Sequence, residues 1–228
     1  MNQFVFRELD RDEAFDPLTL CPDAPFTQAQ FYGQWQAGLG REVRRFVVLE
    51  RERVSAYLQL IKYPLRLGKR YFYLPYGPIT KDFSDDFFAK LKKELIRVAR
   101  AANAVFVRLD FTPPVSSDIL SKFFTPAPSY TYQSAYSQPR VEWFLGLDKS
   151  ENRLLEEMHK GTRYSINLAS RKGITTEIIA SNFEKYFEIF YELLAGTAKR
   201  NGFNLHPKNY YKNIFQNLHS SNAYLAVA

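Results

Sequence analysis

The segment MHKGTRYSINLASRKGI, residues 158–174, carries five side chains that can hold a positive charge. Drawn as a helix, this region predicts a packing face and an opposite polar face. The predicted packing face consists of Leu155, Met158, Thr162, Ser165, Ile166 and Ala169, and the opposite stripe of Lys160, Arg163, Asn167 and Arg171. Such a stripe can lie along a phosphate backbone without reading its sequence, because Lys and Arg displace counterions. An ordinary solvated helix face has the same spacing, so the spacing leaves both interpretations open.

Charge and composition narrow the class of protein. The 228 residues include 31 Lys and Arg against 24 Asp and Glu, a formal charge of +7 that favours nucleic acid, phosphorylated substrates or acidic lipid head groups as partners. The lone Cys21 excludes an internal disulfide framework. The sequence shows neither a signal-peptide pattern nor an apolar run of membrane-spanning length. We therefore expect a cytoplasmic protein that touches a membrane only peripherally.

The first half predicts a strand meander followed by a helix and another strand. Alternating patterns predict strands at residues 44–50, 55–65 and 69–79. A helix is expected over residues 84–102, where Ser84 is a cap and Phe88, Leu91, Leu95 and Val98 have helical spacing. A buried strand over residues 104–111 ends at Asp110, and a Pro-rich connection with at most one short helix follows. This order predicts an α+β fold.

The second half predicts a similar unit. An aromatic strand over VEWFLGLDKS, residues 141–150, leads through a cap at Asp148 or Ser150 into one helix that contains the cationic segment. A strand at 174–180, helices from about 182 and from 206, and an apolar strand at 222–228 complete the pattern. We expect domains at residues 1–142 and 143–228. The second is expected to be incomplete, because the last strand would otherwise leave an apolar edge open.

Several of these pieces together resemble a known family. The chain resembles the Fem (FemABX-type) aminoacyltransferases, which build the interpeptide bridge of bacterial peptidoglycan. The resemblance rests on WFLGL, the cationic segment, TAKRNGF at 197–203 and the Tyr210-Tyr211 pair. PFTQAQFYGQW at 25–35 and YLPYGPI at 73–79 add weaker matches. The resemblance implies tandem acetyltransferase-like (GNAT-like) domains and no cofactor. It implies aminoacyl-tRNA as donor and, as acceptor, the stem-peptide amine of a lipid-linked or UDP-linked muropeptide precursor.

The implied reaction needs little from the protein beyond positioning. An acyl ester on tRNA is already activated, so the enzyme brings an amine to it, accepts a proton and stabilises the oxyanion. A covalent nucleophile is unnecessary. His159, His206 and His219 lack the spacing of a zinc site, and Cys21 has no evident base, so neither a metal centre nor a thiol nucleophile is predicted.

The resemblance also implies roles for single residues. Asp110 occupies the place of an acceptor-site acid that orients the amine or relays its proton; a strand-end cap is the alternative. Tyr210 occupies the place of an acceptor-binding tyrosine, with core packing beside Tyr211 as the alternative. His206 and Gln36 stand where the family usually has an arginine and a lysine, which predicts weakened or altered recognition of precursor phosphate.

The cations of the second half divide between two expected roles. Lys160, Arg163 and Arg171 are assigned to tRNA, whereas Arg200 is a site residue or a charge at a helix end. The family's catalytic lysine is expected beyond residue 228.

Two other functions remain open at this point. One is an acyl-CoA-dependent acetyltransferase of the same fold, although the pyrophosphate loop that binds CoA is not found in the sequence. The other is a non-catalytic basic module that binds RNA or an anionic membrane through the stripe.

Overall fold

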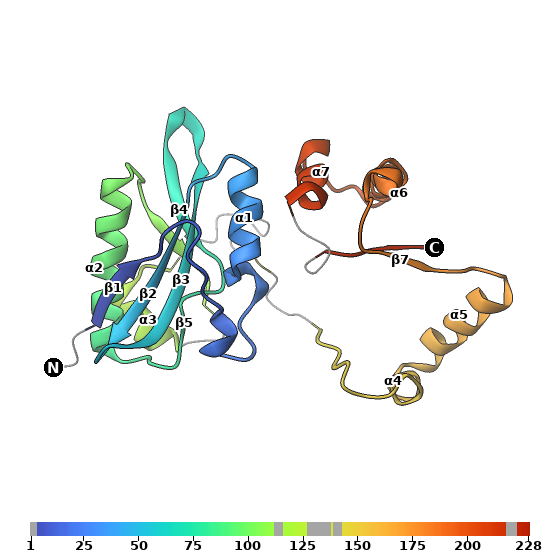
Figure 1. Ribbon diagram of the computed structural model, residues 1–228, viewed down its shortest axis with the longest axis horizontal. Helices are drawn as coiled ribbons and strands as arrows, with labels where there is room; N and C mark the ends of the chain where they lie inside the picture. Colours follow the sequence, from blue (N-terminus) through green and yellow to red (C-terminus); the bar gives the residue numbers. More distant parts are fainter. Residues whose placement is uncertain (1–3, 112–115, 127–137, 139–142, 218–222) are drawn as a thin grey trace. The chain divides into compact units, whose positions relative to one another are not determined.

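A computed structural model of the chain describes residues 4–111, 116–126, 138, 143–217 and 223–228. The chain forms two compact units, Met1–Gln138 and Pro139–Ala228 (Figure 1). That these units are one GNAT-like domain and the beginning of another stays a prediction.

The first unit combines one sheet with helices. Its elements in chain order are β1 (Phe4–Glu8), the 3-10 turns η1 (Pro17–Thr19) and η2 (Phe26–Gln28), α1 (Gln30–Gly38), β2 (Val43–Glu50), β3 (Arg53–Pro64), η3 (Arg66–Gly68), β4 (Arg70–Leu74), β5 (Ile79–Thr80), α2 (Asp85–Ala101), β6 (Val107–Leu109) and α3 (Ser117–Phe123). The predicted helix over 84–102 and the predicted strands at 44–50 and 55–65 are confirmed. The strand predicted over 69–79 ends at Leu74, and the buried strand predicted over 104–111 is reduced to the half-buried β6. In its described part, the Pro-rich connection contains one short helix, as expected.

The sheet is mixed, with strand order β1-β2-β3-β4-β6 and the short β5 paired to β3. Neighbours are antiparallel from β1 to β4, whereas β6 joins β4 in parallel and pairs Leu74 with Leu109. A parallel neighbour requires a crossover, and α2 supplies it. Asp110 follows β6 directly, and its backbone N–H donates to the Leu74 carbonyl at 3.2 Å.

Helix α2 covers one face of this sheet (Figure 1). Its Ser84 hydroxyl accepts the Phe87 N–H at 3.2 Å, and Asp85 and Asp86 occupy the positive end of the helix dipole. Phe87, Phe88, Leu91, Leu95 and Val98 pack against the apolar side chains of β2, β3 and β4. This face is the main core of the first unit.

Helix α1 lies on the opposite face of the sheet (Figure 1), and a buried amide network holds it there. The Gln59 amide on β3 donates to the Thr27 and Ala29 carbonyls, each at 3.1 Å, immediately before the helix begins. Gln28 in turn donates to the Pro75 carbonyl at 2.7 Å and accepts the Gln59 backbone N–H at 2.8 Å. These bonds satisfy buried polar groups and fix the start of α1 on β3.

A glycine permits the close approach of α1 to β3. A Cβ built on Gly33 would lie 2.3 Å from Gln59 Oε1 and 2.9 Å from its Cδ, and Gln59 is fully buried. No larger residue fits without displacing the helix or the amide.

The second unit contains α4 (Glu151–Glu157), α5 (Lys160–Arg171), β7 (Glu177–Ile179), α6 (Glu184–Asn201), α7 (Lys208–Asn217) and β8 (Leu225–Val227). Strand β8 pairs antiparallel with β7, matching Ile179 with Leu225. The small core of the second unit contains Ile179, Phe183 and Leu225, and Tyr186, Phe190 and Phe215 pack against it. Helix α6 ends at Gly202, whose φ of 72° provides the left-handed cap.

Two secondary-structure predictions for the second unit are wrong. Residues 143–150 form no strand, because Trp143 and Phe144 are 94% and 84% exposed and no described strand pairs with them; residues 141–142, which the prediction included, lie outside the described part of the chain. The single helix expected next is two helices, since Met158 is extended at φ −70° and ψ 150°. The His159 side chain then caps α5 by accepting the Gly161 N–H at 3.2 Å.

Candidate functional site

A row of tyrosines lies on the α1 side of the sheet in the first unit. Tyr63 on β3 stacks on Tyr71 of β4, with ring centroids 5.7 Å apart, and meets the edge of Tyr73 at 6.2 Å. Burial raises the pKa of both Tyr71 and Tyr73, and a hydrogen bond to Asp110 raises that of Tyr73 further. All three residues come from the β3–β4 pair, so the pleat places their side chains on one surface.

Asp110 lies at one end of the tyrosine row. The Tyr73 hydroxyl donates to Asp110 Oδ2 at 2.5 Å, and Arg108 Nε lies 3.6 Å from Oδ1. The Arg108 guanidinium also lies 5.9 Å from the Tyr73 ring centroid. About a fifth of the Asp110 side chain is exposed, so the carboxylate is oriented by two neighbours and still reachable by a ligand.

Gln36 lies at the other end of the row. Its side chain is 1% exposed, and its Oε1 accepts from the Tyr63 hydroxyl at 3.3 Å and from Arg41. The Arg41 guanidinium lies 4.3 Å from the Tyr63 ring centroid and donates to the Tyr63 hydroxyl at 3.3 Å. The structure thus joins Gln36 and Asp110, which are far apart in sequence, through Tyr63 and Tyr73.

Sequence reasoning missed Arg41, Tyr63, Tyr73 and Arg108 as neighbours of the predicted residues. The alternation along the strands could have predicted part of this grouping. Tyr71 and Tyr73 share one face of β4, and Arg108 on β6 and Asp110 directly after it share the corresponding face. Arg41 had no such signal, since its placement depends on how the chain leaves α1.

The two predicted acceptor residues of the second unit contact each other. The His206 ring stacks on Tyr210 with centroids 4.1 Å apart, and the His206 backbone N–H donates to the Tyr211 hydroxyl at 3.3 Å. His206 is exposed and Tyr210 is half-buried. A groove shared by these residues with Gln36 and Asp110 stays a prediction.

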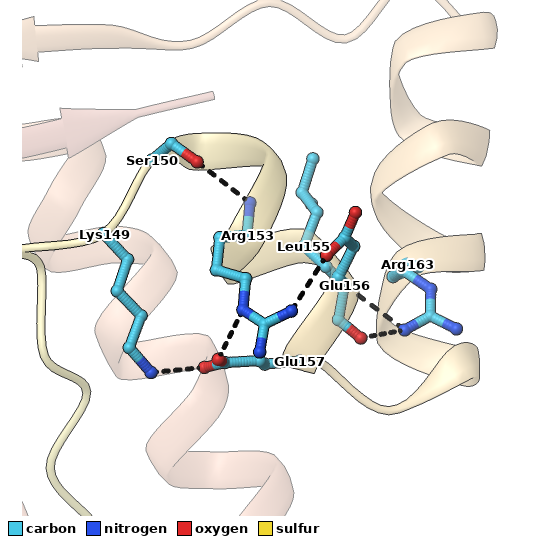
Figure 2. Close-up of polar contacts among 7 residues, drawn as sticks. All are labelled: Lys149, Ser150, Arg153, Leu155, Glu156, Glu157 and Arg163. Carbon is cyan, nitrogen blue, oxygen red and sulfur yellow. Dashed lines mark hydrogen bonds and ion pairs between the residues drawn. The ribbon is translucent and has the colours of Figure 1, made fainter.

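Arg163 of α5 joins the cationic segment to the preceding helix α4 (Figure 2). Its Nη1 donates to the carbonyl oxygens of Leu155 at 3.3 Å, Glu156 at 2.8 Å and Met158 at 2.5 Å. Carbonyls at the end of a helix lack partners within it and carry partial negative charge, so a guanidinium stabilises them. This geometry favours a structural role for Arg163.

Lys160 and Arg171 are exposed on α5. Lys160 makes no ion pair or side-chain hydrogen bond with any residue that the structure describes. Arg171 Nε donates to the Asn167 carbonyl at 3.4 Å, and its guanidinium lies 5.9 Å from the Tyr164 ring centroid. Both charges can therefore reach a ligand.

The predicted packing face of α5 is wrong in three positions. Thr162, Ser165 and Ile166 are exposed, whereas Leu168 and Arg163 are half-buried together with Leu155, Met158 and Ala169. The break at Met158 separates Leu155 and Met158 from α5, so the single helical register that the prediction assumed does not extend across them. Arg200 occupies the last turn of α6 and donates to the Thr197 hydroxyl at 3.5 Å, as a charge near a helix C-terminus does.

Comparison with known proteins identifies relatives of the chain. Residues 128–228 match the model of the FemAB family. A lipid II:glycine glycyltransferase of Staphylococcus haemolyticus is 27% identical over 155 residues, which cover 64% of this chain and 36% of the relative. A protein of the same name from Staphylococcus aureus is 31% identical over 84 residues, or 37% of this chain and 19% of the relative. The chain thus spans about a third or less of the length of these relatives.

A solved structure shares the fold. The crystal structure of FemX aligns with 94% of this chain and 55% of its own chain, at a TM-score of 0.70 and 20% identity. This likeness confirms the predicted α+β, GNAT-like fold class with its mixed sheet. In the part of the chain that the structure describes, no helix is long and apolar enough to cross a membrane. Over residues 128–228, the chain is similar to the FemAB family.

Proposed function

We propose that the protein is an aminoacyltransferase that moves an amino acid from aminoacyl-tRNA to the stem-peptide amine of a peptidoglycan precursor. The observation that carries the proposal is the FemAB match over residues 128–228, which includes the cationic helix α5. Since the similar staphylococcal proteins are named lipid II:glycine glycyltransferases, glycyl-tRNA and lipid II are the first substrates to test.

The proposed chemistry is attack of the acceptor amine on the ester carbonyl of the donor. The N–C amide bond forms, the ester C–O bond breaks, and the 3′-terminal ribose oxygen leaves with a proton. Asp110 is suited to accept a hydrogen bond from the amine and to take its proton, because Tyr73 and Arg108 already hold the carboxylate in place. Tyr73 is a positioning residue, since it acts through Asp110.

The donor is proposed to lie along α5. Lys160 and Arg171 contact its phosphates, and Arg163 holds α4 and α5 at their angle. These contacts are to the backbone of the tRNA, so they give affinity without selecting a base sequence.

Asparagine at position 110 tests the acceptor assignment. Asp110→Asn keeps the size of the side chain and removes the proton acceptor, so transfer of labelled glycine to lipid II should fall by roughly 10²-fold or more. The matched control is Asp12→Asn, an equal charge change at an exposed residue far from the tyrosine row in sequence. Equal activity of the two variants would remove Asp110 from the reaction.

Salt dependence tests the donor assignment. The double variant Lys160→Gln, Arg171→Gln should lower the slope of log affinity against log salt by roughly 2 units for any tRNA, at about 0.7 to 0.9 per phosphate contact. An unchanged slope in the folded double variant would mean that both charges are merely solvated.

A further inference from the structure

Arg41 is a half-buried cation whose polar partners in the described structure are neutral. Its guanidinium donates to the Gln36 amide oxygen and to the Tyr63 hydroxyl, and it lies over the Tyr63 ring. None of the ion pairs among the described residues includes Arg41, whereas four other arginines of the first unit have a carboxylate partner, namely Arg7, Arg44, Arg97 and Arg108. The neighbouring Glu42 is taken by Lys62 at 2.7 Å.

A charge removed from water without a counter-charge is costly, and this one is held in a defined position. Gln36 is 1% exposed, and its side-chain oxygen accepts a hydrogen bond from the Arg41 guanidinium. The backbone N–H of Arg41 also donates to the Gln36 carbonyl at 3.2 Å. Gly40, at φ 77°, turns the chain back over the end of α1 so that both contacts form. The carbonyl end of α1 supplies only partial negative charge.

The positive charge of Arg41 also affects the pKa of Tyr71, which lies on β4. Burial raises the pKa of Tyr71, and the positive charges of Arg108 and Arg41 oppose that rise. Among the described residues, Asp110 is the carboxylate that raises the Tyr71 pKa, and Arg108 and Tyr73 already engage it. In the part of the chain that the structure describes, no carboxylate therefore pairs with the Arg41 guanidinium, and the Tyr63 hydroxyl lies beside it.

We propose that Arg41, held by Gln36 and Tyr63, binds a phosphate group of the acceptor at the end of the tyrosine row opposite Asp110. The planar guanidinium can present two parallel N–H donors to a phosphate, and the Tyr63 hydroxyl can reorient to add a third. The glutamine at position 36 then positions a cation instead of supplying one. This inference rests on the proposed function in naming the acceptor as the source of the phosphate.

Inorganic pyrophosphate is the probe, with binding to the whole 228-residue chain measured by calorimetry at low salt. Arg41→Gln should weaken binding by roughly 10- to 100-fold, the loss expected for a hydrogen-bonded charge. Arg70→Gln is the matched control, because it removes an equal charge from an exposed residue of β4 and should leave affinity within about twofold. Equal weakening by both variants, or no binding by the unmodified chain, would overturn the proposal.

Two further variants separate binding from folding. Arg41→Lys keeps the charge but not the planar fork, so its affinity should lie between those of the unmodified chain and Arg41→Gln. Gln36→Met keeps Arg41 but removes the oxygen that orients it, and should also give an intermediate affinity. Full pyrophosphate affinity in a folded Arg41→Gln variant would refute the assignment.

The source of the phosphate is tested by two ligands in parallel. Arg41→Gln should weaken binding of a UDP-linked muramyl pentapeptide and leave tRNA affinity unchanged; loss confined to tRNA would contradict the proposal. Pyrophosphate binding needs neither donor nor turnover. Absence of glycine transfer with pyrophosphate binding intact would therefore count against the proposed function alone, and transfer without pyrophosphate binding against this inference alone.

Discussion

Replacing Arg163 with glutamine tests whether it is a structural residue. The guanidinium makes two short bonds, at 2.8 and 2.5 Å, and one long bond at 3.3 Å to carbonyls at the end of α4. A hydrogen bond to a charged group contributes roughly 1.5 to 3 kcal/mol, and water replaces part of that here because Glu156 is exposed. Arg163→Gln should therefore cost about 2 kcal/mol of local stability, which is up to about 30-fold in an opening equilibrium.

Hydrogen exchange followed by mass spectrometry measures this loss in α4 itself. Amides of residues 154–158 should exchange up to about 30-fold faster in Arg163→Gln. Arg171→Gln serves as the control, because the substitution removes the same charge from the same helix. Arg171 makes a single hydrogen bond of 3.4 Å, so little local stability is lost with it. If the two variants exchanged equally in α4, the capping role would be wrong. The salt slope of tRNA binding should stay unchanged in Arg163→Gln, since its charge is engaged by the protein.

The remaining predictions concern the first unit. Gly33→Ala should destabilise it by about 1 to 2 kcal/mol in denaturant unfolding, because an overlap at 2.3 Å with a hydrogen-bonded, buried Gln59 outweighs the roughly 1 kcal/mol that alanine adds to a helix; a gain in stability would show that Gln59 moves aside. Ser84→Ala should cost about 1 kcal/mol through loss of the α2 cap, and no change would mean that water replaces the hydroxyl. Burial raises the pKa of Tyr57 to about 12, so its folded-state value exceeds that of the unfolded chain. Its stabilising contribution is complete below about pH 10 and is lost as pH rises toward 12. Phenolate absorbance should accordingly show Tyr57 still protonated near pH 11, and its ionisation below that pH in the folded protein would contradict the burial.

The first unit was largely predictable because its signals are local. Ser84 and the helical spacing of Phe88, Leu91, Leu95 and Val98 determine α2, and alternation determines β2 to β4. Helix α1 was missed because it has no side-chain cap and depends on the distant Gln59 for its position. Such contacts between remote residues leave no periodic pattern in a sequence.

The second unit shows how a single register assumption fails. A cap at Asp148 or Ser150 was predicted, and the Ser150 hydroxyl does accept the Arg153 N–H at 3.3 Å. The break eight residues later was not predicted, because His159 caps α5 with a ring nitrogen and Arg163 bonds backwards to α4. The strand predicted over WFLGL followed from its aromatic and apolar composition, but a strand also needs a partner edge, which composition does not supply.

The same limit applies to the site. Asp110 and Gln36 were singled out by resemblance, but the tyrosines that join them and the cation beside Gln36 follow only from the folded sheet. The prediction of altered phosphate recognition, which rested on Gln36 and His206, stays open. The proposal for Arg41 is one way in which phosphate recognition could be altered, since Arg41 supplies the cation that Gln36 lacks.

The most direct test of the proposed aminoacyl transfer is to offer purified protein two labelled donors with lipid II as the acceptor. We expect label to pass from glycyl-tRNA to the stem peptide and to resist the mild base that hydrolyses the tRNA ester, because the new bond is an amide. Acetyl-CoA should give no labelled product. Label that moved from acetyl-CoA and not from glycyl-tRNA would contradict the proposal and indicate an acyl-CoA-dependent enzyme on the same fold.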